Sequence, residues 1–71
     1  RTETQLMNYF LLNQNKELST EELLNHVWKN DLDANSEVVW IYVSYLRQKL
    51  QSIQSSVRIE GDKGGSYKLV K

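Results

Sequence analysis

The side chains of this chain that could do chemistry are suited to binding, because the residues that catalysis needs are scarce. The 71 residues include a single histidine, His26, and no cysteine. A lone imidazole provides neither a metal site nor a catalytic triad, and a chain without cysteine has no disulfides and no thiolate ligands. No paired carboxylates are expected on a common face. We therefore expect no enzyme activity, no bound metal and no cofactor.

The stretch from Ser36 to Ile53 carries the most informative pattern. Its apolar residues recur in steps of three and four, which predicts one buried stripe of an α-helix: Val39, Val43, Leu46, Leu50 and Ile53. At about 100° per residue, the opposite side carries Glu37, Ile41, Ser44 and Gln48. The flanks carry Trp40 and Arg47 on one edge and Tyr42 and Lys49 on the other, with Tyr45 nearer the outer face. Large side chains outside the core stripe indicate a helix that is held from behind and touches a partner in front.

The distribution of charge favours a polyanionic partner, although the net charge is zero. Residues 1–40 contain three basic and seven acidic residues, whereas residues 41–71 contain six basic and two acidic ones. Binding depends on the local potential more than on the total charge, so this split is a hint of a surface that faces a polyanion. The alternative is chance segregation in a short chain.

Two shorter helices are expected ahead of this long one. Residues 2–13 predict a first helix with a wide apolar face, which the polar, turn-prone residues 13–16 should end. After a short extended link at residues 17–18, residues 19–22 form an S-x-x-E capping box. In this box Ser19 caps the helix and Glu22 reaches back to it. The second helix should then end near Trp28.

The long helix is followed by a predicted β-hairpin. Residues 29–35 form a polar connection to Ser36, which is the expected N-cap of the long helix. Two short alternating segments, residues 57–60 and 66–70, flank a tip at 61–65 that contains all three glycines. The sequence therefore predicts an α+β fold, a winged helix-turn-helix of three helices followed by a C-terminal β-hairpin wing.

The chain is expected to be one small domain of a larger protein. Its length allows only a modest core, and its start on a charged Arg1 within an apparent helix suggests an excised fragment. No apolar run approaches the roughly 20 residues that span a bilayer, and no signal peptide is recognisable. We therefore expect no membrane partner, and the lack of cysteine fits a reducing, cytoplasmic location.

Four segments resemble motifs of one protein family, in order and at matching spacings. Residues 2–7 (TETQLM) are similar to its T-E-x-x-L-L, and residues 19–28 (STEELLNHVW) to its S-x-E-x-L-L-x-x-V-W. Residues 39–50 (VWIYVSYLRQKL) resemble V-x-V-x-I-x-x-L-R-x-K-L, and residues 63–67 (KGGSY) resemble R-G-x-G-Y. Together they make the chain resemble the DNA-binding effector domain of OmpR/PhoB-type two-component response regulators.

This resemblance implies a sequence-specific transcription regulator that binds double-stranded DNA, with the third helix in the major groove and the wing tip in the minor groove. The positions that fall where the family meets DNA are Glu37, Ile41, Ser44, Tyr45, Arg47, Gln48 and Lys63. An apolar Ile41 can contact thymine methyls, and Gln48 can pair with an adenine edge. Arg47 and Lys49 can neutralise phosphates, and Lys63 can follow a narrow minor groove.

The resemblance also implies partners and missing parts. We expect a homodimer on tandem half-sites and control by a receiver domain outside this chain. The chain also lacks the small sheet that precedes the first helix in the family. The aspartates of the connection 29–35 are either solvated turn residues or part of a contact with RNA polymerase.

The chain departs from the family at the predicted contact face. Family members often carry arginines where this chain has Glu37, Ser44 and Tyr45, and an acid where it has Trp40. Fewer cations predict weaker non-specific affinity and a shallower salt dependence. Trp40 either contacts DNA or packs within the domain, whereas Trp28 and Tyr67 are expected to be core aromatics. The alternative function is a winged-helix module that binds a protein, not DNA, through Trp40 and Tyr45.

Overall fold

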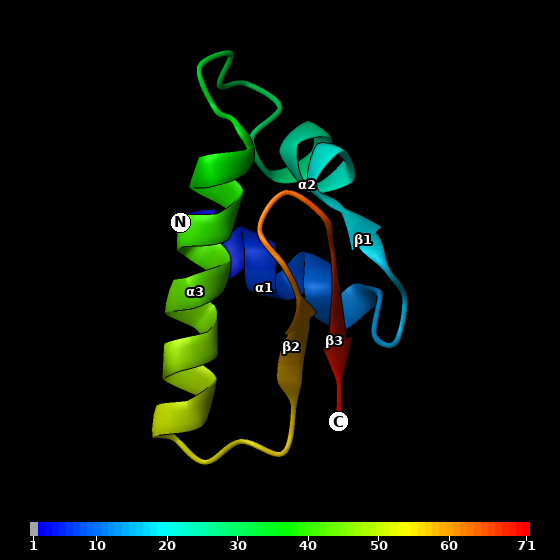
Figure 1. Ribbon diagram of the computed structural model, residues 1–71, viewed down its shortest axis with the longest axis vertical. Helices are drawn as coiled ribbons and strands as arrows, with labels where there is room; N and C mark the ends of the chain where they lie inside the picture. Colours follow the sequence, from blue (N-terminus) through cyan, green and yellow to red (C-terminus); the bar gives the residue numbers. More distant parts are fainter. Residues whose placement is uncertain (1) are drawn as a thin grey trace.

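The computed structural model describes residues 2–71 as three helices and a small antiparallel sheet. The elements follow in the order α1 (Thr2–Leu12), β1 (Leu18–Ser19), α2 (Thr20–Val27), α3 (Ser36–Ser52), β2 (Arg58–Gly61) and β3 (Ser66–Val70). This arrangement, shown in Figure 1, confirms the predicted α+β winged helix-turn-helix fold. Within residues 2–71, none of the helices has the length and apolar content that crossing a membrane requires.

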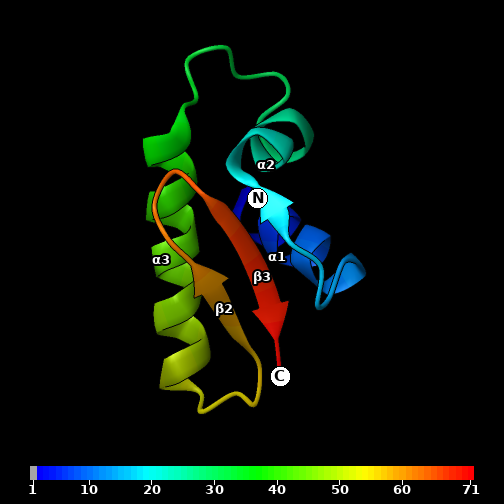
Figure 2. The same cartoon turned by 45° about the vertical axis from the view of Figure 1, so that its right-hand side comes forward.

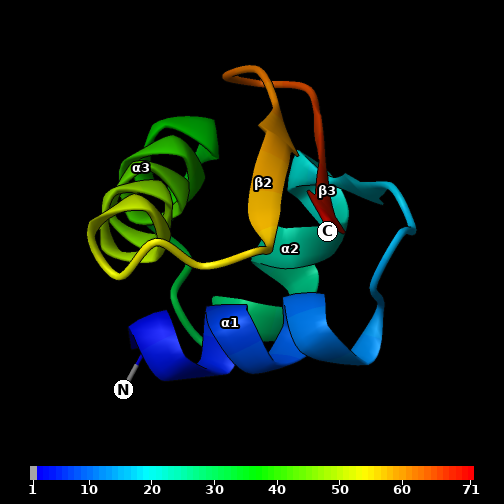
Figure 3. The same cartoon turned by 90° about the horizontal axis from the view of Figure 1, so that it is seen from below.

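The long helix α3 runs alongside the β2–β3 hairpin. Figures 1 and 2 show the tip of this hairpin next to the N-terminal half of α3. Seen from below in Figure 3, α1 lies across one side of the domain, with α3 and the hairpin beside each other. Because α3 contacts α1, α2 and β2, neighbouring elements support it along its buried side.

One hydrophobic core joins all of these elements. Its buried side chains are Leu6, Phe10, Leu18, Leu23, Trp28, Val39, Val43, Leu46, Ile59, Tyr67 and Leu69. The prediction of Trp28 and Tyr67 as core aromatics is therefore confirmed. Burial of apolar surface contributes roughly 25 cal/mol per Å², so these side chains supply most of the drive to fold.

The predicted buried stripe of α3 is correct over its first two turns but not at its end. Its buried members are Val39, Val43 and Leu46. Leu50 packs half-buried against the core, whereas Ile53 is 73% exposed, so the prediction of Ile53 as a core residue is wrong. The reason is local: α3 ends at Ser52, and Ile53 is its C-cap, where the backbone leaves the helix.

The capping box predicted for the second helix is half formed. The Ser19 hydroxyl accepts a hydrogen bond from the Glu22 backbone N–H at 3.0 Å, as an N-cap residue should. The Glu22 carboxylate is used elsewhere, because its Oε2 accepts a hydrogen bond from the Tyr9 hydroxyl at 2.8 Å. Glu22 therefore ties α2 to α1, and burial together with this contact raises the pKa of Tyr9.

The N-cap of α3 is Asn35, so the prediction of Ser36 is wrong by one residue. Asn35 Oδ1 accepts hydrogen bonds from the backbone N–H groups of Glu37 at 3.0 Å and Val38 at 3.2 Å. Its backbone is extended, with φ −141° and ψ −177°, and Ser36 is already the first helical residue. Asparagine and serine are almost equally good N-caps, so residue type alone did not separate these neighbours.

The C-terminal hairpin belongs to a larger sheet than the sequence predicted. Of the expected link at residues 17–18, only the second residue enters β1, which pairs with β3 and places Leu18 opposite Tyr67. The strand order is β1-β3-β2, so β3 is central and β2 is the edge strand beside α3. The hairpin is consequently fixed to the start of α2 on one side and to α3 on the other.

Replacement of Asn35 by alanine should destabilise the domain by about 1 kcal/mol, the usual contribution of an N-cap side chain. The reason is that two backbone N–H groups at the start of α3 lose their acceptor. Ser36→Ala is the matched control and should change the free energy of unfolding by less than about 0.5 kcal/mol. Urea unfolding measures both values. A larger loss at Ser36 than at Asn35 would contradict the cap assignment.

Candidate nucleic-acid interface

The outward face of α3 is open along its length. Ile41 and Tyr45 are 42% and 49% exposed, Glu37 and Gln48 are exposed, and Ser44 is half-buried. The positions expected to face outward are therefore accessible to a partner. Their contact with DNA stays a prediction.

The tip of the hairpin, residues 61–65, lies beside this face because both of its ends are anchored. At one end, the Gly61 carbonyl accepts a hydrogen bond from Arg47 Nη2 at 2.6 Å. At the other end, the Gly65 carbonyl accepts hydrogen bonds from the Thr20 hydroxyl at 2.6 Å and the Thr20 backbone N–H at 3.1 Å. Between these anchors, Lys63 Nζ lies 3.7 Å from Glu37 Oε1 on the first turn of α3. The wing tip and the outward face are thus neighbours.

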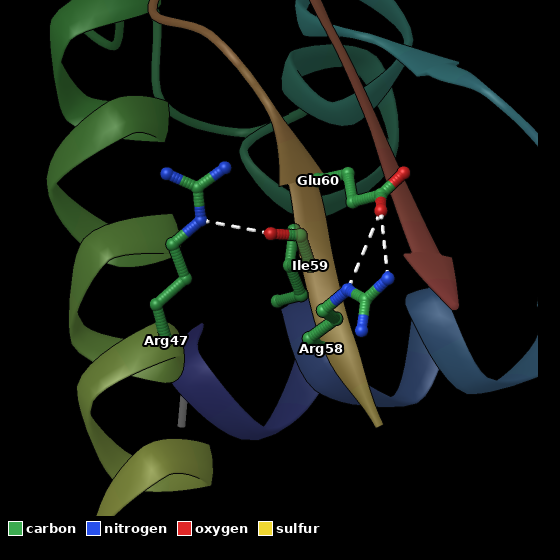
Figure 4. A network of polar contacts seen from close by, with 4 residues as sticks. All are labelled: Arg47, Arg58, Ile59 and Glu60. Carbon is green, nitrogen blue, oxygen red and sulfur yellow. Dashed lines mark hydrogen bonds and ion pairs between the residues drawn. The ribbon is translucent and has the colours of Figure 1, made fainter. Parts of the chain in front are cut away.

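Arg47 is directed toward the hairpin. Its Nε donates a hydrogen bond to the Ile59 carbonyl at 2.9 Å, next to the Nη2 bond to Gly61. Figure 4 shows this side chain reaching from α3 to β2. The predicted contact of Arg47 with a DNA phosphate stays a prediction, but in this structure the guanidinium links the helix to the wing.

Trp40 packs between α3 and the sheet, which is one of the two roles considered for it from the sequence. Its ring stacks on Tyr67, with 6.4 Å between the ring centroids and 26° between the planes. Arg47 Cζ lies 5.3 Å from the centroid of the same Trp40 ring, an arrangement that is attractive electrostatically. These three residues, Trp40, Arg47 and Tyr67, form what we call the helix–wing cluster. Trp40 keeps part of its surface exposed, and its contact with DNA stays a prediction.

Tyr67 is the buried centre of this cluster. Its side chain is fully buried, and its hydroxyl finds no hydrogen-bond partner among residues 2–71. Burial raises the pKa of this hydroxyl, against lowering effects from the nearby Gly64 backbone, the Thr20 side chain and the Arg47 charge. A raised pKa means that the folded state favours the neutral phenol of Tyr67. The stability that depends on this neutral form is complete below about pH 10 and is lost as the pH rises through the folded-state pKa.

Three basic side chains around α3 and the wing pair with acids of the same chain. The pairs are Lys49–Glu3 at 2.5 Å, Arg58–Glu60 at 3.3 Å and Lys63–Glu37 at 3.7 Å. Figure 4 shows the pair on β2. Exposed ion pairs contribute only about 0–1 kcal/mol, so an external phosphate can replace the acid at little cost. The predicted phosphate and minor-groove contacts of Lys49 and Lys63 would therefore form by exchange of partners.

Two residues that hold the wing in place were missed in the sequence. The Thr20 hydroxyl bonds a carbonyl 45 positions further along the chain, and no local pattern signals such a contact. Gly61 has a φ of +134°, and a Cβ there would lie 2.2 Å from the Ser66 carbonyl oxygen. The available signal for Gly61 was a glycine at the end of a predicted strand.

The connection between α2 and α3 is an exposed loop with a local turn. Asp31 Oδ1 accepts a hydrogen bond from the Asp33 backbone N–H at 3.0 Å, and Leu32 between them is 97% exposed. Such a turn accounts for Asp31 without any partner. The contact of residues 29–35 with RNA polymerase stays a prediction.

Comparison with known proteins gives a family match over almost the whole chain. A family model described as "Transcriptional regulatory protein, C terminal" matches residues 1–69. The chain is 36% identical over 67 residues to the response regulator ArlR of Staphylococcus haemolyticus (strain JCSC1435). It is 34% identical over 67 residues to the response regulator ArlR of Staphylococcus aureus (strain COL). Each alignment covers 94% of this chain and 31% of the relative, so the chain spans about a third of the length of these curated relatives.

Alanine at Gly61 should destabilise the domain far more than alanine at Gly64. Both glycines have positive φ, +134° and +82°, a region that costs other residues about 1–2 kcal/mol. A new Cβ meets the Ser66 carbonyl only at Gly61, whereas at Gly64 nothing lies within 4 Å. We expect losses of about 1 kcal/mol for Gly64→Ala and about 3 kcal/mol or more for Gly61→Ala in urea unfolding. Equal losses would mean that β2 and β3 do not approach this closely.

Proposed function

Because the chain belongs to the C-terminal domain family of transcriptional regulatory proteins, we propose that it is the sequence-specific DNA-binding effector domain of a two-component response regulator. The family membership confirms the resemblance predicted from the sequence motifs. It identifies a DNA-binding domain of a transcription regulator and not an enzyme. The proposal adds sequence specificity, the groove contacts and the individual residues.

One observation carries the proposal, namely the open face of α3 beside an anchored wing. The major groove of B-DNA is about 12 Å wide and admits one α-helix. With α3 in that groove, the adjacent hairpin tip would bring Lys63 toward the neighbouring minor groove. Both elements are held by the core and by hydrogen bonds from the Thr20 and Arg47 side chains to carbonyls of the hairpin, so they would meet the duplex as one preformed surface.

The outward side chains suit base edges better than phosphates. Ile41 offers apolar surface for thymine methyl groups, and Gln48 offers the donor and acceptor pair that matches adenine. Ser44 and Tyr45 add hydroxyl groups beside them. Lys49 is suited to a phosphate at the edge of the groove, and Lys63 to a narrow, electronegative minor groove.

The proposal extends to the protein as a whole. Two copies would bind tandem half-sites, each with α3 in the major groove and the wing in the minor groove. A receiver domain outside these 71 residues would control the binding, and residues 29–35 would contact RNA polymerase. The protein would act in the cytoplasm, where it meets chromosomal DNA.

The alternative is that the same face binds a protein. The exposed apolar surface of Ile41 and Tyr45 favours it. The packing of Trp40 against Tyr67 argues against this alternative. Trp40 and Tyr45 were the two aromatic residues expected to contact the protein partner, and Trp40 is packed within the domain. DNA binding is therefore the first function to test.

The test is a selection of bound sequences from random duplex DNA by the full-length protein, at low and then at moderate salt. Enrichment of a direct repeat whose half-sites are one helical turn apart would support the proposal. Failure to bind any duplex at low salt would overturn it. A protein partner lost with Tyr45→Ala, together with that failure, would establish the alternative.

Gln48→Ala should relax recognition at a single base pair of the selected site. A bidentate glutamine–adenine pair is worth about 1–3 kcal/mol of discrimination, and alanine cannot make it. The matched control is Gln51→Ala, an exposed glutamine near the C-terminal end of the same helix, which should leave discrimination unchanged. Competition titrations with base-substituted sites measure the effect. Equal weakening on every sequence would indicate a phosphate contact in place of base readout.

Glu37→Gln should strengthen binding to non-specific DNA. Removing this charge frees Lys63 from its ion pair and removes repulsion from nearby phosphates, so we expect about two- to fivefold tighter binding. The dependence of log K on log salt should steepen by up to about 0.9, the value for one phosphate. Titration of an unrelated duplex from about 50 to about 200 mM salt measures both quantities.

The control for Glu37 is Glu17→Gln, which makes the same charge change elsewhere. Glu17 is exposed and precedes β1, the strand farthest from α3 in the sheet order. Its replacement should leave both the affinity and the salt dependence unchanged. Weaker binding of Glu37→Gln would instead show that the carboxylate itself contacts a base, as an acceptor from cytosine can.

A further inference from the structure

Arg47 completes the edge of the sheet. β2 is an edge strand, and an edge strand presents a row of backbone groups without a strand partner. Residues two apart in a strand point the same way, and the Ile59 and Gly61 carbonyls both accept hydrogen bonds from Arg47, as Figure 4 shows for Ile59. A guanidinium holds its N–H donors in a rigid planar fork. One side chain of α3 therefore bonds two carbonyls of β2 at once.

Trp40 supplies a second contact to the other strand of the hairpin. It precedes Arg47 by seven residues, about two helical turns, so both lie on the same edge of α3. Its ring stacks on Tyr67 of β3, which is the register partner of Gly61. Arg47 thus holds β2 while Trp40 holds β3. Contacts to both strands fix the angle of the hairpin as well as its distance from the helix.

Lys63 lies midway between the two anchored glycines of the tip. The Gly61 carbonyl is bonded by Arg47 and the Gly65 carbonyl by Thr20, and each glycine is two residues from Lys63. Without the Arg47 bonds, the hairpin would keep its attachment to α2 and, toward α3, the Trp40–Tyr67 stacking and the exposed Lys63–Glu37 ion pair, which is weak. The place of Lys63 relative to α3 therefore depends on Arg47.

We propose that Arg47 is a positioning residue that sets the wing against α3, so that Lys63 meets the minor groove while α3 occupies the major groove. This role rests on the proposed function and replaces the phosphate contact that the sequence predicted for Arg47. It requires more than a positive charge, because the ammonium group of lysine is a point donor and cannot reproduce the planar fork. Arg47→Lys therefore separates positioning from charge.

The first experiment needs no DNA and measures amide hydrogen exchange in the full-length protein. Arg47→Lys and Arg47→Met should each speed exchange in residues 61–66 by about tenfold or more, while α1 and α2 keep their protection. If a variant loosens the whole domain, exchange rises equally in α1 and α2. If the substitutions speed exchange in residues 61–66 no more than in α1 and α2, the positioning role is wrong.

The second experiment is a double-mutant cycle with Lys63 on the selected duplex. Lys63→Ala should weaken binding and lower the salt slope by about 1. Arg47→Lys should do the same although it keeps its charge, with an affinity loss of about tenfold, the effect of one charge-assisted hydrogen bond. In the Lys63→Ala background the further effect of Arg47→Lys should nearly vanish, because the wing contact is already lost.

Two results would overturn this role, and a third would separate it from the proposed function. If Arg47→Lys keeps the affinity and salt slope while Arg47→Met loses them, Arg47 is a phosphate contact and the proposal is wrong. Additive losses at Arg47 and Lys63 would also overturn it. If the unaltered protein binds no duplex, the proposed function fails, and the exchange experiment alone decides whether Arg47 holds the wing.

Discussion

The structure depends on the packing of the Tyr67 ring between the sheet and α3. Tyr67 lies on the central strand, opposite Leu18 of β1 and Gly61 of β2, and it stacks on Trp40 of α3. It is the largest fully buried side chain of the domain. A Cβ at Gly61 would lie 2.9 Å from Tyr67 Cδ1, so the glycine is required for β2 to close over the ring. The aromatic pair, the glycine and the helix edge are therefore one packing unit, and the wing is part of the core.

The periodicity of apolar residues within each element explains how much of this fold could be predicted from the sequence. The helical and strand periods identify which side chains point inward over a few residues, so the hairpin and the buried face of α3 as far as Leu46 were predicted correctly, whereas Ile53 lies beyond the end of the helix. Ile41 and Gln48 are accessible as expected because their orientation depends only on the pitch of one helix. A strand of two residues, β1, is too short to show a period, and Asn35 and Ser36 are too similar as caps to be ranked by type.

The parts of the candidate site that the sequence left open or missed depend on contacts between distant residues. Arg47 and Gly61 are 14 positions apart, and Thr20 and Gly65 are 45 positions apart, so no pattern within one element could reveal either bond. A sequence reading treats a long basic side chain at the edge of a helix as free to reach a phosphate. The unpaired carbonyls of an edge strand compete for that same guanidinium, and this competition is visible only when the sheet order is known. The direction of Arg47 and the packing of Trp40 therefore required the structure.

The contacts that the charged residues make within the protein affect the specificity of DNA binding. Non-specific affinity for DNA grows with the number of phosphates neutralised, at about 0.9 in the salt slope for each. Here Arg47 is bonded within the protein and Lys63 is paired with Glu37, so a phosphate contact by either side chain needs an exchange of partners. Base contacts from Ile41 and Gln48 need no such exchange, because these side chains are already exposed. On the proposed function, a surface of this kind has a low affinity for non-specific DNA but still contacts base edges. Its selectivity then depends on where the wing is held more than on how much charge the wing carries.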